Sequence, residues 1–386
     1  MKKIVFLYFV PLTQNWENKS FMRDLIGAGF EVECWDVTDM YFKRADFTEI
    51  VERDYVKKLS SLRAVEDRLK TTNVKNTAFI LTIPLQMGSL RLYRLFSRYR
   101  CGMLAFAWGL MPHGPKDLSL TRKILKYAGG LMNPEKLKSY FLNKTPLLYK
   151  GLRLIKEYDV VFAAGSITAS MHEKYSKIVP VNYFDYDSYL RIRDDGNRLV
   201  DGDYCVYLDG NLAYDNDFKI LKIKTVTPDK YYKSLKRFFD LIEKKYGVEV
   251  VIAGSPKSEY ADGFFGKRRI YKYKTNELVK DCSFAIANFS TSIAYAVLYR
   301  KATIFYYTDE IRSLSHFEGI KNFAAILNCN MYNIDSLWDE SRLEIKPVDL
   351  KKYDDYKYAY LTSKESENRY SKDIFLEYLK SYEASS

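Results

Sequence analysis

The chain has 386 residues, a hydrophobic fraction of 47% and a formal net charge of +12. This length and apolar content are enough for two globular domains, each with its own buried core. The positive charge favours an anionic partner. Lys and Arg are interleaved with acids, however, and no zinc-finger, RNA-binding or helix-turn-helix pattern is present, so we expect no nucleic acid partner.

The first half of the sequence alternates apolar, β-rich runs with segments of helical spacing. We predict strands at residues 3–9, 30–37, 77–82, 102–108, 159–164 and 179–183, and helices at 18–28 and 90–99. Continuous apolar runs that alternate with helices are typical of a parallel sheet covered on both faces. A polar segment at residues 191–203 is the candidate linker to a second domain.

A second α/β series follows the polar segment. We predict strands at residues 204–208, 248–253, 269–273, 284–288 and 302–307, and helices at 228–246, 275–280, 290–299 and 371–382. Two such series predict an α/β fold of two Rossmann-like domains that face each other across a cleft. The expected domains are residues 1–195 and 204–370, followed by a C-terminal helix at 371–386.

The N-terminus reads as a first buried strand rather than a signal peptide. Its apolar run is short, Pro11 ends it, and no small-residue cleavage site follows. No segment has the length and apolarity of a membrane span. The number of Cys residues is odd and none has CxxC spacing, which favours buried free thiols in a reducing cytosol. We therefore expect a cytoplasmic protein.

Residues 116–157 form a basic stretch in which ten Lys and Arg accompany three acids, with Leu, Ile, Tyr and Phe between them. Such a stretch suits peripheral contact with an anionic membrane at the inner face of the cell. It equally suits the solvated face of helices around an ordinary core.

The strongest local signal is the segment Asn288-Phe289-Ser290-Thr291-Ser292-Ile293, between a predicted strand and a predicted helix. A helix start presents unpaired N–H groups, and small polar side chains there can surround a phosphate. The alternative is simple capping of the helix by Ser290.

A second signal is the segment Gly254-Ser255-Pro256-Lys257 after the strand at 248–253. Gly254 would let the chain turn closely, Pro256 would end the strand, and Lys257 could pair with a phosphate. An ordinary strand exit with a surface Lys explains the segment equally well.

Several acidic residues also lie near predicted strand ends. Asp209 is well placed as a general base towards an acceptor hydroxyl, and Asp215 with Asp217 could hold a divalent cation such as Mg²⁺. Turn formation is the alternative for all three. Asp185 could contact an acceptor or a metal, although capping of the following helix is the favoured interpretation.

Of the three His residues, His113 in a predicted strand-end loop is the best candidate for contact with an acceptor. The His residues lack metal spacing, so we assign no metal site. The sequence has no GxSxG, P-loop or GxGxxG motif, which weighs against serine hydrolases, P-loop phosphotransferases and dinucleotide oxidoreductases.

The order YLDG, GSPK and NFSTSIAYAVLYRKATIFYY resembles bacterial sialyltransferase-like and Kdo-transferase-like enzymes of the glycosyltransferase-B (GT-B) fold. These enzymes build capsules, O-antigens and lipooligosaccharides, and they carry an acidic-acidic-Gly, a His-Pro and a Ser-Ser/Thr motif. The resemblance covers mainly residues 204–307. It departs from the family at Leu208, where the first acid is usual, and at Ser255, where His is usual.

The resemblance implies that Asp209 is the base, that Ser290, Thr291 and Ser292 bind the donor phosphate, and that Pro256 and its neighbours mark the nucleotide pocket. We therefore expect a glycosyltransferase that moves a sugar, Kdo or a nonulosonic acid, from a CMP-linked donor to a surface glycan or lipid-linked glycan. The alternatives are a polyol-phosphate transferase of the teichoic-acid type and a non-catalytic nucleotide- or glycan-binding homologue.

Overall fold

The computed structural model describes residues 3–44, 47, 49–108, 112, 149, 152, 154–214, 224–256, 258–314 and 316–382. The chain divides into two compact units. The first comprises Met1–Trp108, Pro115–Val181 and Glu365–Ser386, and the second comprises Gly109–Gly114 and Asn182–Lys364.

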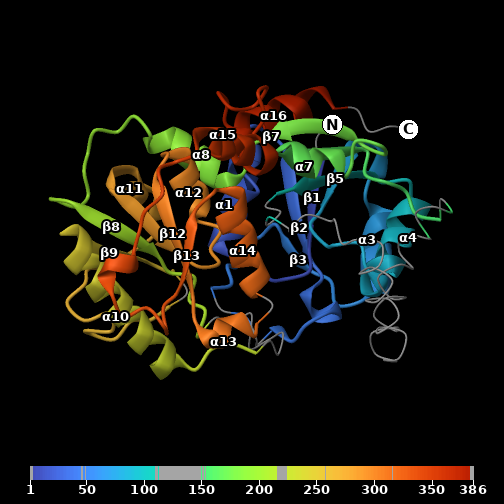
Figure 1. The fold of residues 1–386 in the computed structure, drawn as a ribbon. Helices are drawn as coiled ribbons and strands as arrows, with labels where there is room; N and C mark the ends of the chain where they lie inside the picture. Colours follow the sequence, from blue (N-terminus) through green and yellow to red (C-terminus); the bar gives the residue numbers. More distant parts are fainter. Residues whose placement is uncertain are drawn as a thin grey trace, which may run out of the picture. The chain divides into compact units, whose positions relative to one another are not determined.

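Among its described residues, the first unit contains a seven-stranded sheet in the order β3-β2-β1-β4-β5-β6-β7 (Figure 1). All the strand pairs in it are parallel. The strands are β1 (Lys3–Tyr8), β2 (Glu31–Asp36), β3 (Val56–Lys58), β4 (Thr77–Leu81), β5 (Gly102–Ala107), β6 (Val160–Ala164) and β7 (Lys177–Val181). The helices are α1 (Gln14–Lys19), α2 (Met22–Gly27), α3 (Leu62–Thr71), α4 (Leu90–Arg98), α7 (Ser166–Ser170) and α16 (Ser371–Ser381).

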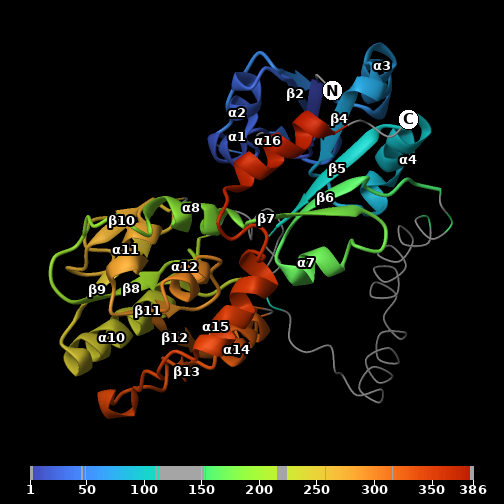
Figure 2. The same cartoon turned by 90° about the horizontal axis from the view of Figure 1, so that it is seen from above.

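Both faces of the first sheet are buried. Successive residues of a strand point to opposite sides, so each strand contributes residues to two different cores. In β1, Ile4 and Phe6 belong to the core that includes residues of α2 and α16. Val5 and Leu7 belong to the other core, which includes residues of α3 and α4. The C-terminal helix α16 therefore completes the first unit (Figure 2), although the whole second unit precedes it in the chain.

Among its described residues, the second unit contains a six-stranded parallel sheet in the order β10-β9-β8-β11-β12-β13 (Figure 1). The strands are β8 (Tyr204–Leu208), β9 (Glu249–Gly254), β10 (Ile270–Lys272), β11 (Phe284–Ala287), β12 (Ala302–Tyr307) and β13 (Asn330–Asn333). The helices are α8 (Phe184–Ile192), α10 (Pro228–Tyr246), α11 (Thr275–Asp281), α12 (Ile293–Leu298), α13 (Asp309–Arg312), α14 (His316–Ile326) and α15 (Leu350–Tyr356).

Helix α10 shows how local signals set an element of this unit. Pro228 occupies its first turn, and Gly247 ends it in the left-handed conformation at φ 64°. Its buried face includes Tyr231, Phe238 and Phe239, which pack near the strand residues Tyr207 and Tyr306. The aromatic rings of α10 thus cover the middle of the second sheet.

Both sheets follow the Rossmann order, in which the first strand lies between the second and the fourth. The predicted fold class of two Rossmann-like α/β domains is therefore confirmed. All the predicted strands are present, and the structure adds β3 and β13, which the sequence patterns did not identify.

The predicted helix at 18–28 is two helices, because Phe21 takes a left-handed conformation at φ 57° between α1 and α2. The division into units also differs from the expected boundary at 195. Residues 182–192 belong to the second unit, where α8 packs against α11 and α12. The helix at 371–381 is part of the first unit instead of a separate segment.

In the part of the chain that the structure describes, every helix is too short or too polar to span a bilayer. Most of the basic stretch at 116–157 lies outside the described residues.

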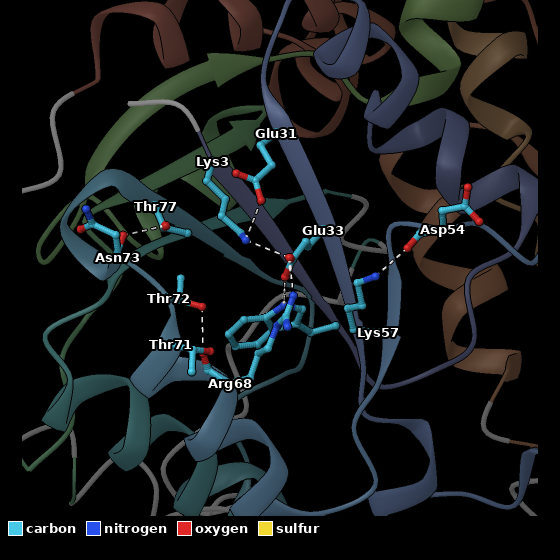
Figure 3. Close-up of polar contacts among 11 residues, drawn as sticks. Lys3, Glu31, Glu33, Asp54, Lys57, Arg68, Thr71, Thr72, Asn73 and Thr77 are labelled. Atoms are coloured by element: carbon cyan, nitrogen blue, oxygen red, sulfur yellow. Dashed lines mark hydrogen bonds and ion pairs between the residues drawn. The ribbon is translucent and has the colours of Figure 1, made fainter.

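A charged cluster lies on the first two strands of the first unit, where β1 and β2 pair in register (Figure 3). Glu33 is only 7% exposed and accepts hydrogen bonds from Lys3 at 2.8 Å, Trp35 at 2.7 Å and Arg68 at 2.5 Å. Lys3 also contacts the exposed Glu31 at 2.8 Å. The cluster joins β1, β2 and α3 through one buried carboxylate.

We expect Glu33→Gln to lower the free energy of unfolding by about 1–3 kcal/mol at neutral pH, because Lys3 and Arg68 lose their charged partner. Burial alone would raise the pKa of Glu33, but the hydrogen bonds from Lys3, Trp35 and Arg68 outweigh it and lower the pKa below 4.5. The contribution is therefore present above pH 4.5 and disappears as the pH falls through the lowered pKa. Urea unfolding at several pH values measures this difference.

The matched control is Glu31→Gln, because Glu31 binds the same Lys3 amine but its side chain is 61% exposed. We expect this exposed pair to contribute less than about 1 kcal/mol. An equal loss in the two variants would contradict a special role for the buried carboxylate.

Candidate functional site

Three of the predicted motifs follow three adjacent strands of the second unit. Asp209 follows β8, Ser255 follows β9 and Asn288 follows β11, and the sheet order places β8 between the other two. Because these strands are parallel, their carboxyl ends lie at one edge of the sheet. The strand order reverses between β8 and β11, and ligands of such sheets bind at this switch point.

The Asp209 side chain is held at this edge by hydrogen bonds to both of its oxygens. Its Oδ2 accepts from the Tyr260 hydroxyl at 2.5 Å. Its Oδ1 accepts from the Asn211 backbone N–H at 2.9 Å and from the Tyr207 hydroxyl at 3.3 Å. The residue is 8% exposed. Burial raises the pKa of Asp209 above its ordinary value, although the hydrogen bonds from Tyr260, the Asn211 N–H and Tyr207 act in the opposite direction.

Tyr260 links the loop after β9 to Asp209. Its hydroxyl accepts from the Ser255 backbone N–H at 2.7 Å while it donates to Asp209. Burial, followed by the charge of Asp209, raises the pKa of Tyr260, so this hydroxyl keeps its proton at neutral pH. The side chain of Lys272 lies over the same ring, with Nζ at 5.6 Å from the centroid.

Gly254 has a different role from the expected one. It is the last residue of β9, and its φ lies outside the left-handed region. A Cβ at this position would lie 2.9 Å from Tyr260 Cε2 and 2.9 Å from Ile270 Cγ2. Glycine is therefore needed because the Tyr260 ring packs directly on the backbone, which brings its hydroxyl to Asp209.

A buried group of tyrosine hydroxyls continues from Asp209 to the loop after β11. The Tyr207 hydroxyl lies 2.9 Å from that of Tyr306 and 3.3 Å from that of Tyr231. Tyr231 and Tyr306 are 2.6 Å apart at their hydroxyls. Asn288 Nδ2 donates to the Tyr231 hydroxyl at 3.2 Å. The hydrogen-bonded group therefore joins the ends of β8, β11 and β12 below the surface of the site.

The Ser290-Thr291-Ser292 segment forms a turn before α12, which begins three residues later than predicted. Ser292 is the residue that precedes the helix, and its side chain makes no capping hydrogen bond. The Ser290 hydroxyl accepts from the Ser292 N–H at 3.3 Å. Ser290 is therefore not the N-cap of α12, and it stabilises the turn instead.

The backbone N–H groups of Ser290 and Thr291 have no acceptor among the described residues. The Thr291 side chain is exposed and hydrogen-bonds the hydroxyl of the buried Tyr183. Two consecutive unpaired N–H groups beside a parallel sheet edge form the kind of backbone arrangement that binds an anion.

Phe289 anchors this turn to α14. A Cβ at Gly319 would lie 2.1 Å from Phe289 Cε2, so the Phe289 ring lies directly against the α14 backbone. The ring also contacts Phe323 with centroids 6.2 Å apart. The position of the turn thus depends on a glycine in a helix that is distant in sequence.

Asp185 lies in the first turn of α8, and the helix begins before it at Phe184. The expected capping role is therefore not observed, because Tyr183 is the residue that precedes the helix. Instead, Asp185 Oδ1 accepts from the Tyr295 hydroxyl of α12 at 3.1 Å.

His113, Asp215, Asp217 and Lys257 lie outside the described residues, whereas Pro256 is described and exposed. Among the described residues, no three His, Cys, Asp or Glu side chains come together as candidate metal ligands. Four of the described Cys residues are buried, and burial raises the pKa of each thiol. A raised pKa is typical of unreactive thiols.

Sequence reasoning did not identify Tyr260, Tyr231 or Tyr306 as part of this site. Tyr260 follows Pro256 in a polar loop, and the other two belong to a predicted helix and a predicted strand. Tyr is so frequent in this chain, with 34 residues, that its presence gave no local signal.

No protein-family model matches the chain, and no curated protein matches its sequence. Solved structures do resemble it. The glycosyltransferase of kitacinnamycin has a TM-score of 0.48 at 9% identity, covering 98% of each chain. The wall teichoic acid polymerase TagF has a TM-score of 0.49 at 10% identity, covering 98% of this chain and 88% of the polymerase.

The UDP-GlcNAc 2-epimerase of Methanocaldococcus jannaschii has a TM-score of 0.45 at 12% identity, covering 98% of this chain and 99% of the epimerase. At such identities, these likenesses concern the fold and assign no activity to the chain.

We expect Gly254→Ala to lower the free energy of unfolding by about 1–3 kcal/mol, because the added methyl group displaces the Tyr260 ring or Ile270. Thermal unfolding measures the loss, and hydrogen exchange of the Ser255 backbone N–H reports the displaced hydroxyl. Gly27→Ala is the matched control, since nothing lies within 4 Å of a Cβ there. Unchanged stability in Gly254→Ala would contradict the close packing of Tyr260.

Proposed function

We propose that this chain is a glycosyltransferase that binds a nucleotide-activated sugar at the carboxyl edge of β8, β9 and β11. The observation that carries the proposal is the pair of backbone N–H groups at Ser290 and Thr291 that have no acceptor among the described residues, at the same sheet edge as the buried carboxylate of Asp209. The two N–H groups would bind the donor phosphate, and the carboxylate would accept the proton of the acceptor hydroxyl. Both lie at the switch point where doubly wound sheets bind nucleotides.

In the proposed reaction, one of these groups accepts the proton and the other stabilises the leaving phosphate. The acceptor hydroxyl attacks the anomeric carbon of the donor sugar, and its proton passes to the Asp209 carboxylate. The bond between the anomeric carbon and the phosphate oxygen breaks, and its electron pair stays on that oxygen. The N–H groups of Ser290 and Thr291, with the hydroxyls of Ser290, Thr291 and Ser292, stabilise the charge that develops there.

The donor and acceptor follow from the sequence resemblance. We propose a CMP-linked Kdo or nonulosonic acid as donor, a membrane-associated glycan as acceptor, and acceptor binding by the first domain. Ser255 stands in place of the expected His, and its backbone N–H is already bound to Tyr260. The positively charged side chains that pair with the phosphate would be those of Lys272, which lies near Tyr260, and of Lys257.

The experiment that tests this function is a thermal-shift panel of CMP, CDP, UDP, GDP and ADP, with and without magnesium. A ligand that binds only the native state raises the melting temperature. At a ligand concentration of 100 times its Kd, the free energy of unfolding increases by about 2.7 kcal/mol. We expect selective stabilisation by CMP. Selective stabilisation by UDP or GDP would keep the glycosyltransferase and discard the CMP-linked donor.

No shift with any nucleotide would contradict the proposed function. Two alternatives are distinguished by adding CDP-glycerol to the panel and by measuring product release. A polyol-phosphate transferase would be stabilised by CDP-glycerol and would release CMP from it in the presence of an acceptor. A non-catalytic homologue would bind a nucleotide without ever releasing free sugar from a nucleotide sugar.

Asp209→Asn tests the base directly, because the amide keeps the shape of the side chain and one acceptor oxygen, for Tyr260 or for the Asn211 N–H, and removes the proton-accepting carboxylate. We expect kcat to fall by about 100-fold or more while donor affinity changes little. Because burial raises the pKa of Asp209 above 3.8, the wild-type kcat/KM should rise with pH along an acid limb above that value. The limb should be absent from the residual activity of the variant.

Asp229→Asn, at an exposed position in the first turn of α10, is the control and should retain full activity. If Asp209→Asn turns over normally, the carboxylate serves only to position Tyr260 and the loop after β9. Tyr260→Phe would then be the more damaging substitution of the two.

A further inference from the structure

Asn211 is a buried residue whose side-chain amide has no hydrogen-bond partner among the described residues. It is 3% exposed and lies in the loop after β8 in the left-handed conformation, at φ 52°. Its backbone is satisfied, because its N–H donates to Asp209 Oδ1 at 2.9 Å and its carbonyl accepts from the Tyr214 N–H at 3.0 Å. Its side-chain amide makes no hydrogen bond to another described residue.

Leaving a buried amide without a partner is costly, by about 1–3 kcal/mol, and natural structures rarely do so. Neither amide atom of Asn211 belongs to the fully enclosed polar atoms that lack a partner. The amide therefore faces a space that solvent or a ligand can enter.

Asn288 provides a comparison within the same site. It follows the neighbouring strand β11 and is 1% exposed. Both ends of its amide are used, since Nδ2 donates to the Tyr231 hydroxyl at 3.2 Å and Oδ1 accepts from the Phe289 N–H at 2.6 Å. The described residues thus satisfy the amide of Asn288 and leave that of Asn211 without a partner.

The position of Asn211 indicates which part of a donor it would contact. The preceding Gly210 lies against the loop after β11, because a Cβ there would be 3.2 Å from the Phe289 carbonyl oxygen. Asn211 therefore follows a residue that lies against the loop after β11, and its own N–H binds the Asp209 carboxylate. In the proposed reaction the anomeric carbon lies between that carboxylate and the phosphate, so a residue of this segment would lie next to the transferred sugar.

We propose that the Asn211 amide hydrogen-bonds a hydroxyl group of the transferred sugar, which makes it a residue that determines sugar binding. This inference rests on the proposed function. An amide both donates and accepts, and so does a hydroxyl. A phosphate oxygen only accepts at neutral pH and would leave Oδ1 without a partner.

Asn211→Gly tests the proposal, because glycine keeps the left-handed backbone and removes the amide. The probes are CMP against CMP-N-acetylneuraminic acid, and UDP against UDP-N-acetylglucosamine, with affinities measured by calorimetry. We expect the affinity for the nucleotide alone to stay within about twofold, and that for the corresponding nucleotide sugar to fall about tenfold, the effect of one lost hydrogen bond.

Asn328→Gly is the matched control, since Asn328 is also left-handed, at φ 57°, but exposed after α14. It should change neither affinity. Thermal unfolding of the ligand-free Asn211→Gly variant is the second measurement, and an unchanged melting temperature shows that the glycine has not loosened the loop.

Three results would overturn the proposal. Equal loss of affinity for nucleotide and nucleotide sugar would place Asn211 at the phosphate, and unchanged affinity for both would make it a turn residue only. If the wild-type protein binds neither probe pair, the proposed function fails and the inference fails with it. In the first two cases, nucleotide binding by the wild type shows that the proposed function survives.

Discussion

The hydrogen bond from the Tyr260 hydroxyl to the Asp209 carboxylate holds the candidate site together. It joins the loops after β8 and β9 across a distance of 2.5 Å, and the same hydroxyl fixes the Ser255 N–H. The bond exists because Gly254 lets the Tyr260 ring lie on the strand backbone. A carboxylate at 8% exposure is stable only with such donors, so the charge and its partners are mutually dependent.

The tyrosine hydroxyls extend this dependence through the second unit. Tyr207, Tyr231 and Tyr306 are buried polar groups that satisfy one another, and Asn288 connects them to the turn that follows β11. A partly satisfied network would destabilise the core, so its members act as a unit. This network explains how loops that are distant in sequence take fixed positions around one sheet edge, where a ligand would need preorganised donors.

Much of this arrangement could be predicted from local patterns. The strand runs, the helix at 228–246 with its Pro and Gly ends, and the two doubly wound series all follow from hydrophobic periodicity and turn residues. The placement of Asp209, Ser255 and Asn288 at strand ends followed from the same patterns. Boundaries between the units did not, because α8 packs against α11 and α12, and α16 packs on the core of the first sheet, and these partners lie far from them in the chain.

The sequence by itself determined the fold class and the edge of the sheet at which the candidate residues lie, since both depend on residues that are close in the chain. Only the tertiary structure decided what each residue does there. Gly254 serves packing of Tyr260 rather than a turn, and Ser290 stabilises a turn rather than a helix end. The buried amide of Asn211 has no partner in the part of the chain that the structure describes. These roles are set by contacts between residues from different strands and helices, which no local pattern records.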